Sequence, residues 1–171
     1  KNLFSKENLP IDIIISPEFE VAKSLYRKLE APGAIDSIPF ADDMVRLLEI
    51  QIDEKCPLLN TSLSKLSEIF SDLQANVLGA IRKDKFIIFK KTDKLLKDDK
   101  AFVLTNSKQV DRTLSIFGRD EKFAKTILII GAGNIGLDLA KLLEEDEQKP
   151  RIKIIEKNPE RAEKIATDLN E

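Results

Sequence analysis

The chain has 171 residues, of which 42% are hydrophobic and 34% are charged, a balance typical of globular domains. Its 28 basic and 30 acidic residues leave a net charge of −2, so no surface for nucleic acid is expected. The chain has no histidine, which excludes Ser-His and Cys-His nucleophile pairs and the usual zinc ligand. It has one cysteine, which excludes a disulfide or a thiolate metal cluster within one chain. We therefore expect neither catalytic nor metal-binding residues.

The first elements predict the C-terminal end of an α/β domain. A short apolar run, Ile11–Ile15, suits a buried strand. Ser16–Glu18 supplies a capping serine, a proline at the first helical position and an acid in the first turn. Three apolar residues then recur every four positions and predict the core face of this helix, Val21, Leu25 and Leu29, with Ala22 and Tyr26 alongside. The pattern ends at Ala31–Gly33.

Short strands and helices follow, up to Gly118. We expect a strand over 45–52 and then a helix over 62–70. A hairpin follows, with strands 77–82 and 86–89 and the three-residue connection 83–85. The last elements are a strand over 101–105 and a helix capped by Asn106 or Ser107. Alternation in the first strand slips at Leu47–Leu48, which predicts a bulge or burial on both faces. The order β-α-β-β-β-α indicates an α+β domain of roughly 80 residues.

The last segment has the pattern of a dinucleotide-binding unit: an apolar strand ending at Ile130, a glycine-rich turn, a helix, a second strand, 152–155, and a final helix from Asn158. Gly131 would allow the sharp turn, Gly133 the approach of a diphosphate, and Gly136 close packing of helix on strand. The candidate cofactor-binding residues are Gly131, Gly133, Asn134, Ile135, Gly136 and Glu156. In the alternative interpretation the glycines serve packing only.

Glu156 lies 20 residues after Gly136 (156 − 136), at the end of the second strand. A carboxylate there can accept hydrogen bonds from ribose hydroxyls. It would also repel a 2′-phosphate, so NAD(H) or an adenine nucleotide is favoured over NADP(H).

Four stretches carry a family resemblance: 9–18, 38–42, 56–59 and 126–136. By these, and by their order, the chain resembles the TrkA family, the regulatory subunits of bacterial Trk-type potassium uptake systems. Their RCK architecture alternates a Rossmann-like N-lobe with a small C-lobe. The resemblance implies α/β plus α+β architecture, with partial Rossmann-like segments at both ends flanking a small α+β TrkA-C (RCK-C) domain.

The implied domains are the tail of a first N-lobe (1–33), the TrkA-C domain (34–118) and the first half of a second, nucleotide-binding N-lobe (119–171). The resemblance also implies a regulator without a turnover reaction. It would bind NAD(H), ATP or ADP, assemble as a dimer or ring, and control a membrane potassium-transporter subunit. No run approaches the roughly 18 apolar residues of a membrane-spanning helix. The resemblance implies a cytoplasmic protein, peripheral at the inner face of the cell membrane.

The chain begins at Lys1 and stops after a second helix pattern, so we expect an excerpt of a longer protein. A complete dinucleotide pocket uses loops from several strands, whereas only two are expected after Arg119, so binding by these residues alone should be weak or absent. Two other functions stay open. One is a fragment of an NAD-dependent oxidoreductase, and the other is a structural assembly module that has lost its ligand.

Overall fold

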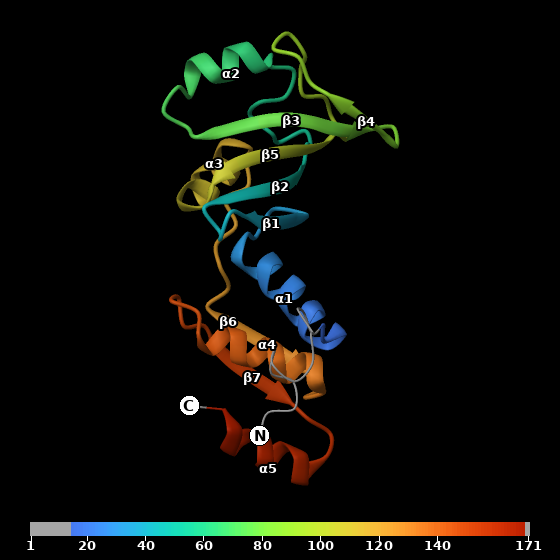
Figure 1. Ribbon diagram of the computed structural model, residues 1–171, viewed down its shortest axis with the longest axis vertical. Coiled ribbons are helices and arrows are strands. Elements are labelled where there is room, and N and C mark those ends of the chain that lie inside the picture. Colours follow the sequence, from blue (N-terminus) through green and yellow to red (C-terminus); the bar gives the residue numbers. More distant parts are fainter. Residues whose placement is uncertain (1–14, 170–171) are drawn as a thin grey trace, which may run out of the picture. The chain divides into compact units, whose positions relative to one another are not determined.

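A computed structural model describes residues 15–169, which form two compact units (Figure 1). One unit contains the residues up to Tyr26 together with those from Ala124 onward, and the other contains Arg27–Phe123. Most of the strand expected at Ile11–Ile15 lies outside the described residues. The division of the chain into three domains, at residues 33 and 118, stays a prediction.

Helix α1, Pro17–Glu30, begins where the capping sequence predicted. Its predicted core face is buried only in part. Val21 and Leu25 are 45% and 41% exposed, while Ala22 is fully buried. The prediction is therefore wrong for Val21 and Leu25 but not for Ala22, because a spacing of four shows which residues share a face and not which of them find a packing partner.

The unit Arg27–Phe123 is built on an antiparallel sheet in the order β1-β2-β5-β3-β4. Its strands are β1 Asp36–Phe40, β2 Val45–Gln51, β3 Ala75–Arg82, β4 Lys85–Ile88 and β5 Lys100–Asn106. Its helices are α2 Leu63–Ile69 and α3 Val110–Ile116, the latter preceded by the 3-10 turn η1 Ser107–Gln109. Four of the strands and both helices were predicted.

Strand β1 was not predicted. It pairs with β2 alone, so it is an edge strand, and it contains Pro39. Proline has no N–H to donate to a neighbouring strand, and it is tolerated at sheet edges for that reason. The same proline weakens the strand signal in the sequence, which explains the omission.

Strand β2 runs without a register shift against both β1 and β5, so the bulge considered at Leu47–Leu48 is wrong. Leu48 points into the core and Leu47 to the other, half-buried face. The apparent slip arises at Arg46, which is buried on the core side of the strand. Its guanidinium is held there by the carboxylates of Glu30 and Asp43. The irregularity of this sheet lies instead in β3, between Val77 and Gly79.

The β3–β4 connection has two residues and not three. Arg82 pairs with Lys85, and Lys83 and Asp84 between them have φ angles of 51° and 60°. Positive φ at both central positions is the signature of a type I′ turn, whose twist matches that of the flanking strands.

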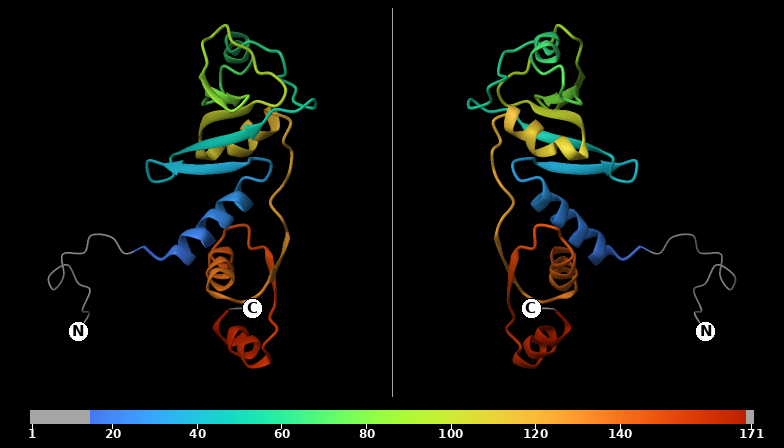
Figure 2. Two further views of the ribbon diagram at one scale, coloured as in Figure 1. Left: turned by 90° about the vertical axis from the view of Figure 1, so that its right-hand side faces the viewer. Right: turned by 90° about the vertical axis from the view of Figure 1, so that its left-hand side faces the viewer.

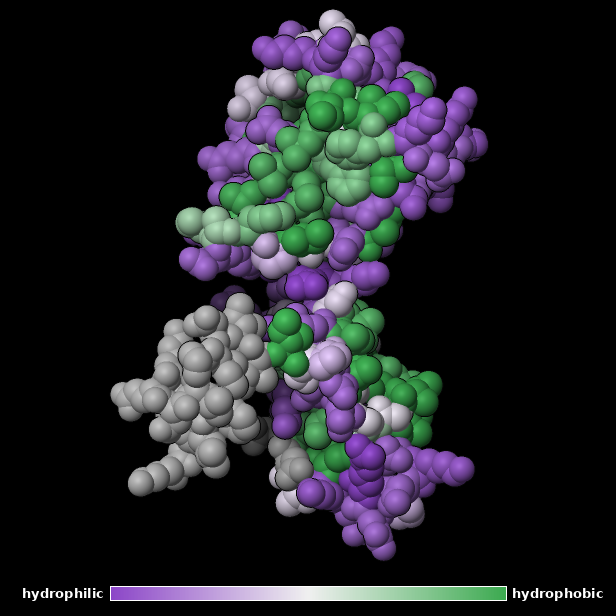
Figure 3. All heavy atoms as spheres, turned by 45° about the vertical axis from the view of Figure 1, so that its right-hand side comes forward, coloured by the Kyte–Doolittle hydropathy of each residue, from purple (hydrophilic) through white to green (hydrophobic). Residues whose placement is uncertain are grey.

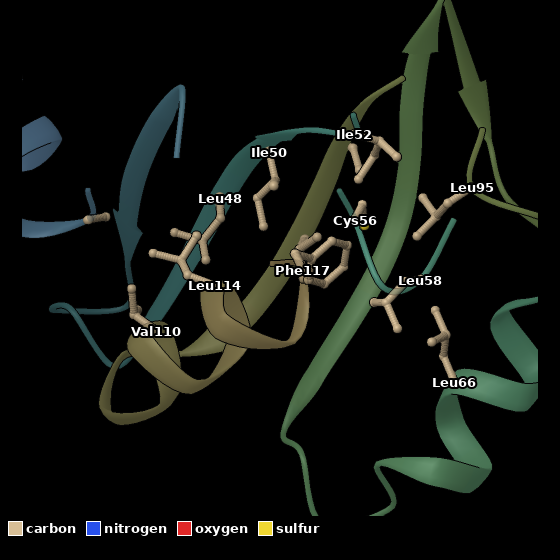
Figure 4. Close-up of a cluster of buried hydrophobic side chains, with 13 residues drawn as sticks. Leu48, Ile50, Ile52, Cys56, Leu58, Leu66, Leu95, Val110, Leu114 and Phe117 are labelled. Carbon is tan, nitrogen blue, oxygen red and sulfur yellow. The ribbon is translucent and has the colours of Figure 1, made fainter. Parts of the chain in front are cut away.

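The core of this unit lies between the sheet and helices α2 and α3 (Figure 4). Alternate residues of β2 and β5 point into it, and α3 closes it with Leu114 and Phe117. The buried cluster consists of Ala31, Leu48, Ile50, Ile52, Cys56, Leu58, Leu66, Leu95, Ala101, Val103, Val110, Leu114 and Phe117.

The other unit contains β6 Thr126–Ile130, α4 Asn134–Glu144, β7 Arg151–Ile155 and α5 Pro159–Asp168. Strands β6 and β7 are parallel, with Ile127 opposite Ile152 and Ile130 opposite Ile155. Helix α4 packs beside both strands (Figure 2) and buries Leu139, Ala140 and Leu143. This β-α-β arrangement is half of a Rossmann-like fold, so the chain combines α/β and α+β architecture as expected. Within residues 15–169, no helix is long and apolar enough to cross a membrane.

Candidate functional site

Gly131 forms the turn that leaves strand β6. Its N–H donates to the carbonyl oxygen of Ile155 at 2.8 Å, which extends the pairing of β6 with β7 by one bond. Its φ of +94° lies in the left-handed region that residues with a Cβ rarely adopt. A Cβ on Gly131 would meet nothing within 4 Å. The backbone conformation, and not lack of space, is therefore the reason for glycine here.

Gly133 is the N-cap of α4, with an extended backbone at φ −65° and ψ −179°. The first N–H groups of a helix have no partner within it. Within the described part of the chain no side chain caps those of α4, and the space around Gly133 is open to 4 Å. Asn134 and Ile135, in the first turn, are exposed. Unpaired N–H groups at the positive end of a helix dipole are suited to bind an anion such as a phosphate group.

Gly136 has a packing role. A Cβ on it would lie 2.4 Å from the carbonyl oxygen of Gly131 and 3.2 Å from Cγ2 of Ile129. The first turn of α4 therefore lies directly on the end of β6, at a distance that only glycine permits.

The Glu156 carboxylate points at the glycine-rich turn. Its Oε2 accepts a hydrogen bond from the N–H of Ala132 at 3.0 Å, and its Oε1 accepts one from the N–H of Asn158 at 2.9 Å. The bonds from Asn158 and then Ala132 hold the pKa of Glu156 below its usual range. The structure thus brings all six candidate residues together at the carboxyl ends of two parallel strands.

Two features of this site were not predicted. The buried residue Ala132 contributes the N–H that orients Glu156, and nothing in its residue type indicates this. Arg161, in the first turn of α5, adds a positive charge that helps to lower the pKa of Glu156. It also lines a cavity of about 420 Å³ between α4 and α5, together with Leu137, Asn158, Glu160, Lys164 and Ile165. A basic residue in the first turn of a helix that follows the acid was the available signal.

The residues present are suited to a nucleotide, because unpaired N–H groups can take phosphate oxygens and a carboxylate with spare acceptor positions lies beside them. Among the described residues, no group of three or more Cys, Asp or Glu is placed to hold a metal ion. The fold and this site define a protein that joins half of a Rossmann-like unit to a small α+β domain.

Comparison with known proteins gives the family. The TrkA-C domain matches residues 47–118, and the TrkA-N domain matches residues 127–170. The chain is 41% identical over 170 residues to a Trk system potassium uptake protein TrkA from Azorhizobium caulinodans, covering 99% of this chain and 37% of that protein. It is 34% identical over 167 residues to its counterpart in Vibrio alginolyticus, covering 98% of this chain and 36% of the relative. The chain belongs to the TrkA family.

The chain spans little more than a third of the length of the relatives. Among solved structures, a GsuK RCK domain is similar with a TM-score of 0.44 and 16% identity, over 83% of this chain and 30% of the other.

Proposed function

We propose that this chain is the nucleotide-binding part of a cytoplasmic regulatory subunit that controls potassium uptake without a turnover reaction. The observation that carries the proposal is the junction of β6 and α4, where an open, uncapped helix N-terminus lies beside the Glu156 carboxylate. The ligand would be NAD(H), ATP or ADP. The names of the relatives support the link to potassium uptake.

The phosphate groups of the ligand would bind at the N–H groups of the α4 N-terminus, from Gly133 through Gly136. Because Gly133 has no side chain, phosphate oxygens can reach these groups. The ribose would lie against Glu156. An ionised carboxylate has about four acceptor positions, and Ala132 and Asn158 occupy two of them. The remaining positions can accept both ribose hydroxyls.

Selectivity against NADP(H) would follow from the same carboxylate. A 2′-phosphate would place a second negative group beside Glu156, a carboxylate that is ionised at neutral pH and whose pKa two N–H groups hold below its usual range. Arg161 lies close enough to influence that pKa and would offset part of the repulsion. We therefore propose a preference for unphosphorylated ribose, and not complete exclusion.

Regulation would act by a population shift. A nucleotide that binds one arrangement of the protein more tightly than another stabilises the first by the difference in binding free energy, and a tenfold ratio is worth about 1.4 kcal/mol per site. Copies associated as a dimer or ring would add these contributions together. The assembly would act on a membrane potassium-transporter subunit at the inner face of the cell membrane.

The test is isothermal titration of the chain with NADH, ATP, ADP and NADPH. Because only two strands of the fold contribute, we expect dissociation constants above the micromolar range, with NADPH the weakest ligand. Gly133→Asp should abolish binding, because it places a carboxylate in the phosphate position. The variant should still fold, since aspartate is among the best N-cap residues.

Gln148→Glu is the matched control, because it adds the same charge at an exposed position in the turn after α4. It should leave the dissociation constants unchanged. If Gly133→Asp binds a nucleotide as well as the unaltered chain does, the nucleotide site is wrong. The alternative of a ligand-free assembly module would then be favoured.

A further inference from the structure

A cavity of about 330 Å³ lies between helix α2 and the sheet of the unit Arg27–Phe123. Its walls come from α2, from strands β3 and β5, from the end of α3 and from the segment 89–91 that follows β4. Leu66, the buried residue of α2, points toward Leu58 of the core (Figure 4). A volume of this size lies within the range of small-molecule sites, roughly 300–1,000 Å³. We call it the α2 cavity.

Backbone hydrogen bonds hold the first turn of α2 in place. The N–H of Leu63 donates to the carbonyl oxygen of Asp93 at 3.1 Å, and the N–H of Ser64 donates to that of Lys91 at 2.8 Å. The first turn therefore lies against the segment that follows β4, and it forms one fixed wall of the α2 cavity. The cavity is thus a feature of the hydrogen-bonded fold and not a gap under a free loop.

The walls of the α2 cavity are apolar and incompletely covered. Protein interiors are normally packed so closely that few voids exceed the size of a water molecule. Here Val103 and Phe117 of the core line the cavity. Six further apolar side chains that pack against the core also line it and remain only partly buried: Leu63, Phe70, Ala75, Val77, Phe89 and Ile116. Such walls are suited to the hydrocarbon part of a ligand.

The polar groups of the cavity select the sign of charge on that ligand. Apolar surface alone would not do so, because this unit also has a broad hydrophobic area open to solvent (Figure 3). Lys90 and Lys91 are exposed and line the α2 cavity, so they lie at its opening. In the described part of the chain neither forms an ion pair, and none of the residues that line the cavity is an aspartate or a glutamate. The opening therefore complements a negative group.

We propose that the α2 cavity binds an apolar carboxylate, with its hydrocarbon part in the cavity and its carboxylate at Lys90 and Lys91. At roughly 30 Å³ for each water-sized group, the cavity has room for about ten such groups, which corresponds to a carboxylate of about eight carbons. A lysine ammonium offers three donors and no acceptor, so it suits a carboxylate. Two sources supply such molecules, namely fatty acids from lipid and branched 2-oxo acids from the carbon skeletons of amino acids.

The test is isothermal titration calorimetry of the 171-residue chain with octanoate. We expect a dissociation constant on the order of 100 µM, which is ordinary for about ten non-hydrogen atoms. Octan-1-ol has the same chain without the charge and should bind at least about tenfold more weakly, the usual effect of losing hydrogen bonds to a charged group. 4-Methyl-2-oxopentanoate is titrated alongside, because the tighter of the two carboxylates identifies the source of the ligand.

Lys90→Gln with Lys91→Gln should weaken octanoate binding at least about tenfold for the same reason. Lys83→Gln with Lys85→Gln is the matched control, because it removes two charges at exposed positions of the same unit that do not line the cavity. It should leave the dissociation constant unchanged. Val77→Phe should abolish binding by filling the cavity, and circular dichroism shows whether each variant is folded.

The proposal is overturned if neither carboxylate binds at about 1 mM, well above the expected dissociation constant, or if octan-1-ol binds as tightly as octanoate. It is equally overturned if the control at Lys83 and Lys85 weakens binding as much as the change at Lys90 and Lys91, or if folded Val77→Phe still binds. The nucleotide site takes no part, so Gly133→Asp should bind octanoate normally. Loss of nucleotide binding alone would refute the proposed function and leave this inference intact.

Discussion

The carbonyl oxygen of Gly131 occupies the place that a side chain on Gly136 would need, since a Cβ there would come within 2.4 Å of it. The contact joins the end of β6 to the first turn of α4. Gly133, three residues earlier, has no atom within 4 Å of its Cβ position. Two glycines of one motif therefore have different roles, one in packing and one in leaving space for a ligand.

We expect Gly136→Ala to lower the free energy of unfolding by about 1–3 kcal/mol, the usual cost of overpacking against atoms that cannot move away. Gly133→Ala should cost less than about 1 kcal/mol, since its φ of −65° suits alanine and only its capping quality declines. It should nevertheless weaken nucleotide binding. Urea denaturation and titration with NADH measure the two effects separately. Equal losses of stability would contradict the division of roles.

The orientation of Glu156 should depend on pH. Because the pKa of the folded carboxyl lies below that of the unfolded chain, about 4.3, the hydrogen bonds to Ala132 and Asn158 add stability above that pH. That contribution to stability is lost as the pH falls through the lower pKa that Glu156 has in the folded protein. We expect the amide resonances of Ala132 and Asn158 to shift together with a midpoint below 4.3.

Glu156→Gln serves as the control for this titration, because its amide oxygen can still accept one hydrogen bond but carries no charge between pH 3 and 7. The two amides should then show no common transition in that range. A midpoint at or above the ordinary glutamate value, or an unchanged transition in the variant, would show that the carboxylate does not hold the turn.

Local patterns predicted most of the elements. Asn158 followed by Pro159 gave the start of α5, and the structure has Asn158 accepting a hydrogen bond from the N–H of Arg161. The patterns could not predict which side chains would be covered by other parts of the chain. Val21 and Leu25 repeat as core residues do, yet they are exposed, and Arg46 looks like a surface residue, yet it is buried. Such outcomes depend on contacts between residues far apart in the chain.

In the candidate site, too, local features were predicted and long-range contacts were not. Spacing predicted that Glu156 follows the second strand, because strand, turn and helix lengths are properties of the local sequence. It could not predict that the carboxylate binds the N–H of Ala132, 24 residues away, which requires two strands to pair in a particular register. Arg161 went unnoticed because its influence on Glu156 depends on how α5 returns after β7.

Arg82 should be far more important for stability than an arginine on the surface. It donates to both carboxylate oxygens of Asp99 at 2.7 Å, and the Asp99 side chain is fully buried. Arg82→Met should therefore cost about 3–5 kcal/mol, because it leaves a buried charge without its partner. Arg112→Met is the control, as Arg112 pairs with Asp72 in an exposed position. Its effect in the same urea titration should be much smaller, and comparable losses would contradict this assignment.

The β3–β4 turn should be open to improvement. Lys83 and Asp84 both adopt positive φ, at 51° and 60°, although lysine is poorly suited to it and aspartate less suited than glycine. Replacing them by Asn and Gly (Lys83→Asn with Asp84→Gly), the preferred pair for a type I′ turn, should stabilise the protein by about 0.5–1 kcal/mol. Thermal unfolding monitored by circular dichroism measures the change. As a control, Lys85→Gly in the adjoining strand should destabilise, since glycine there adds flexibility without relieving strain. Unchanged stability in the double variant would mean that the turn is not strained, and that the register Arg82–Lys85 is set by the strands alone.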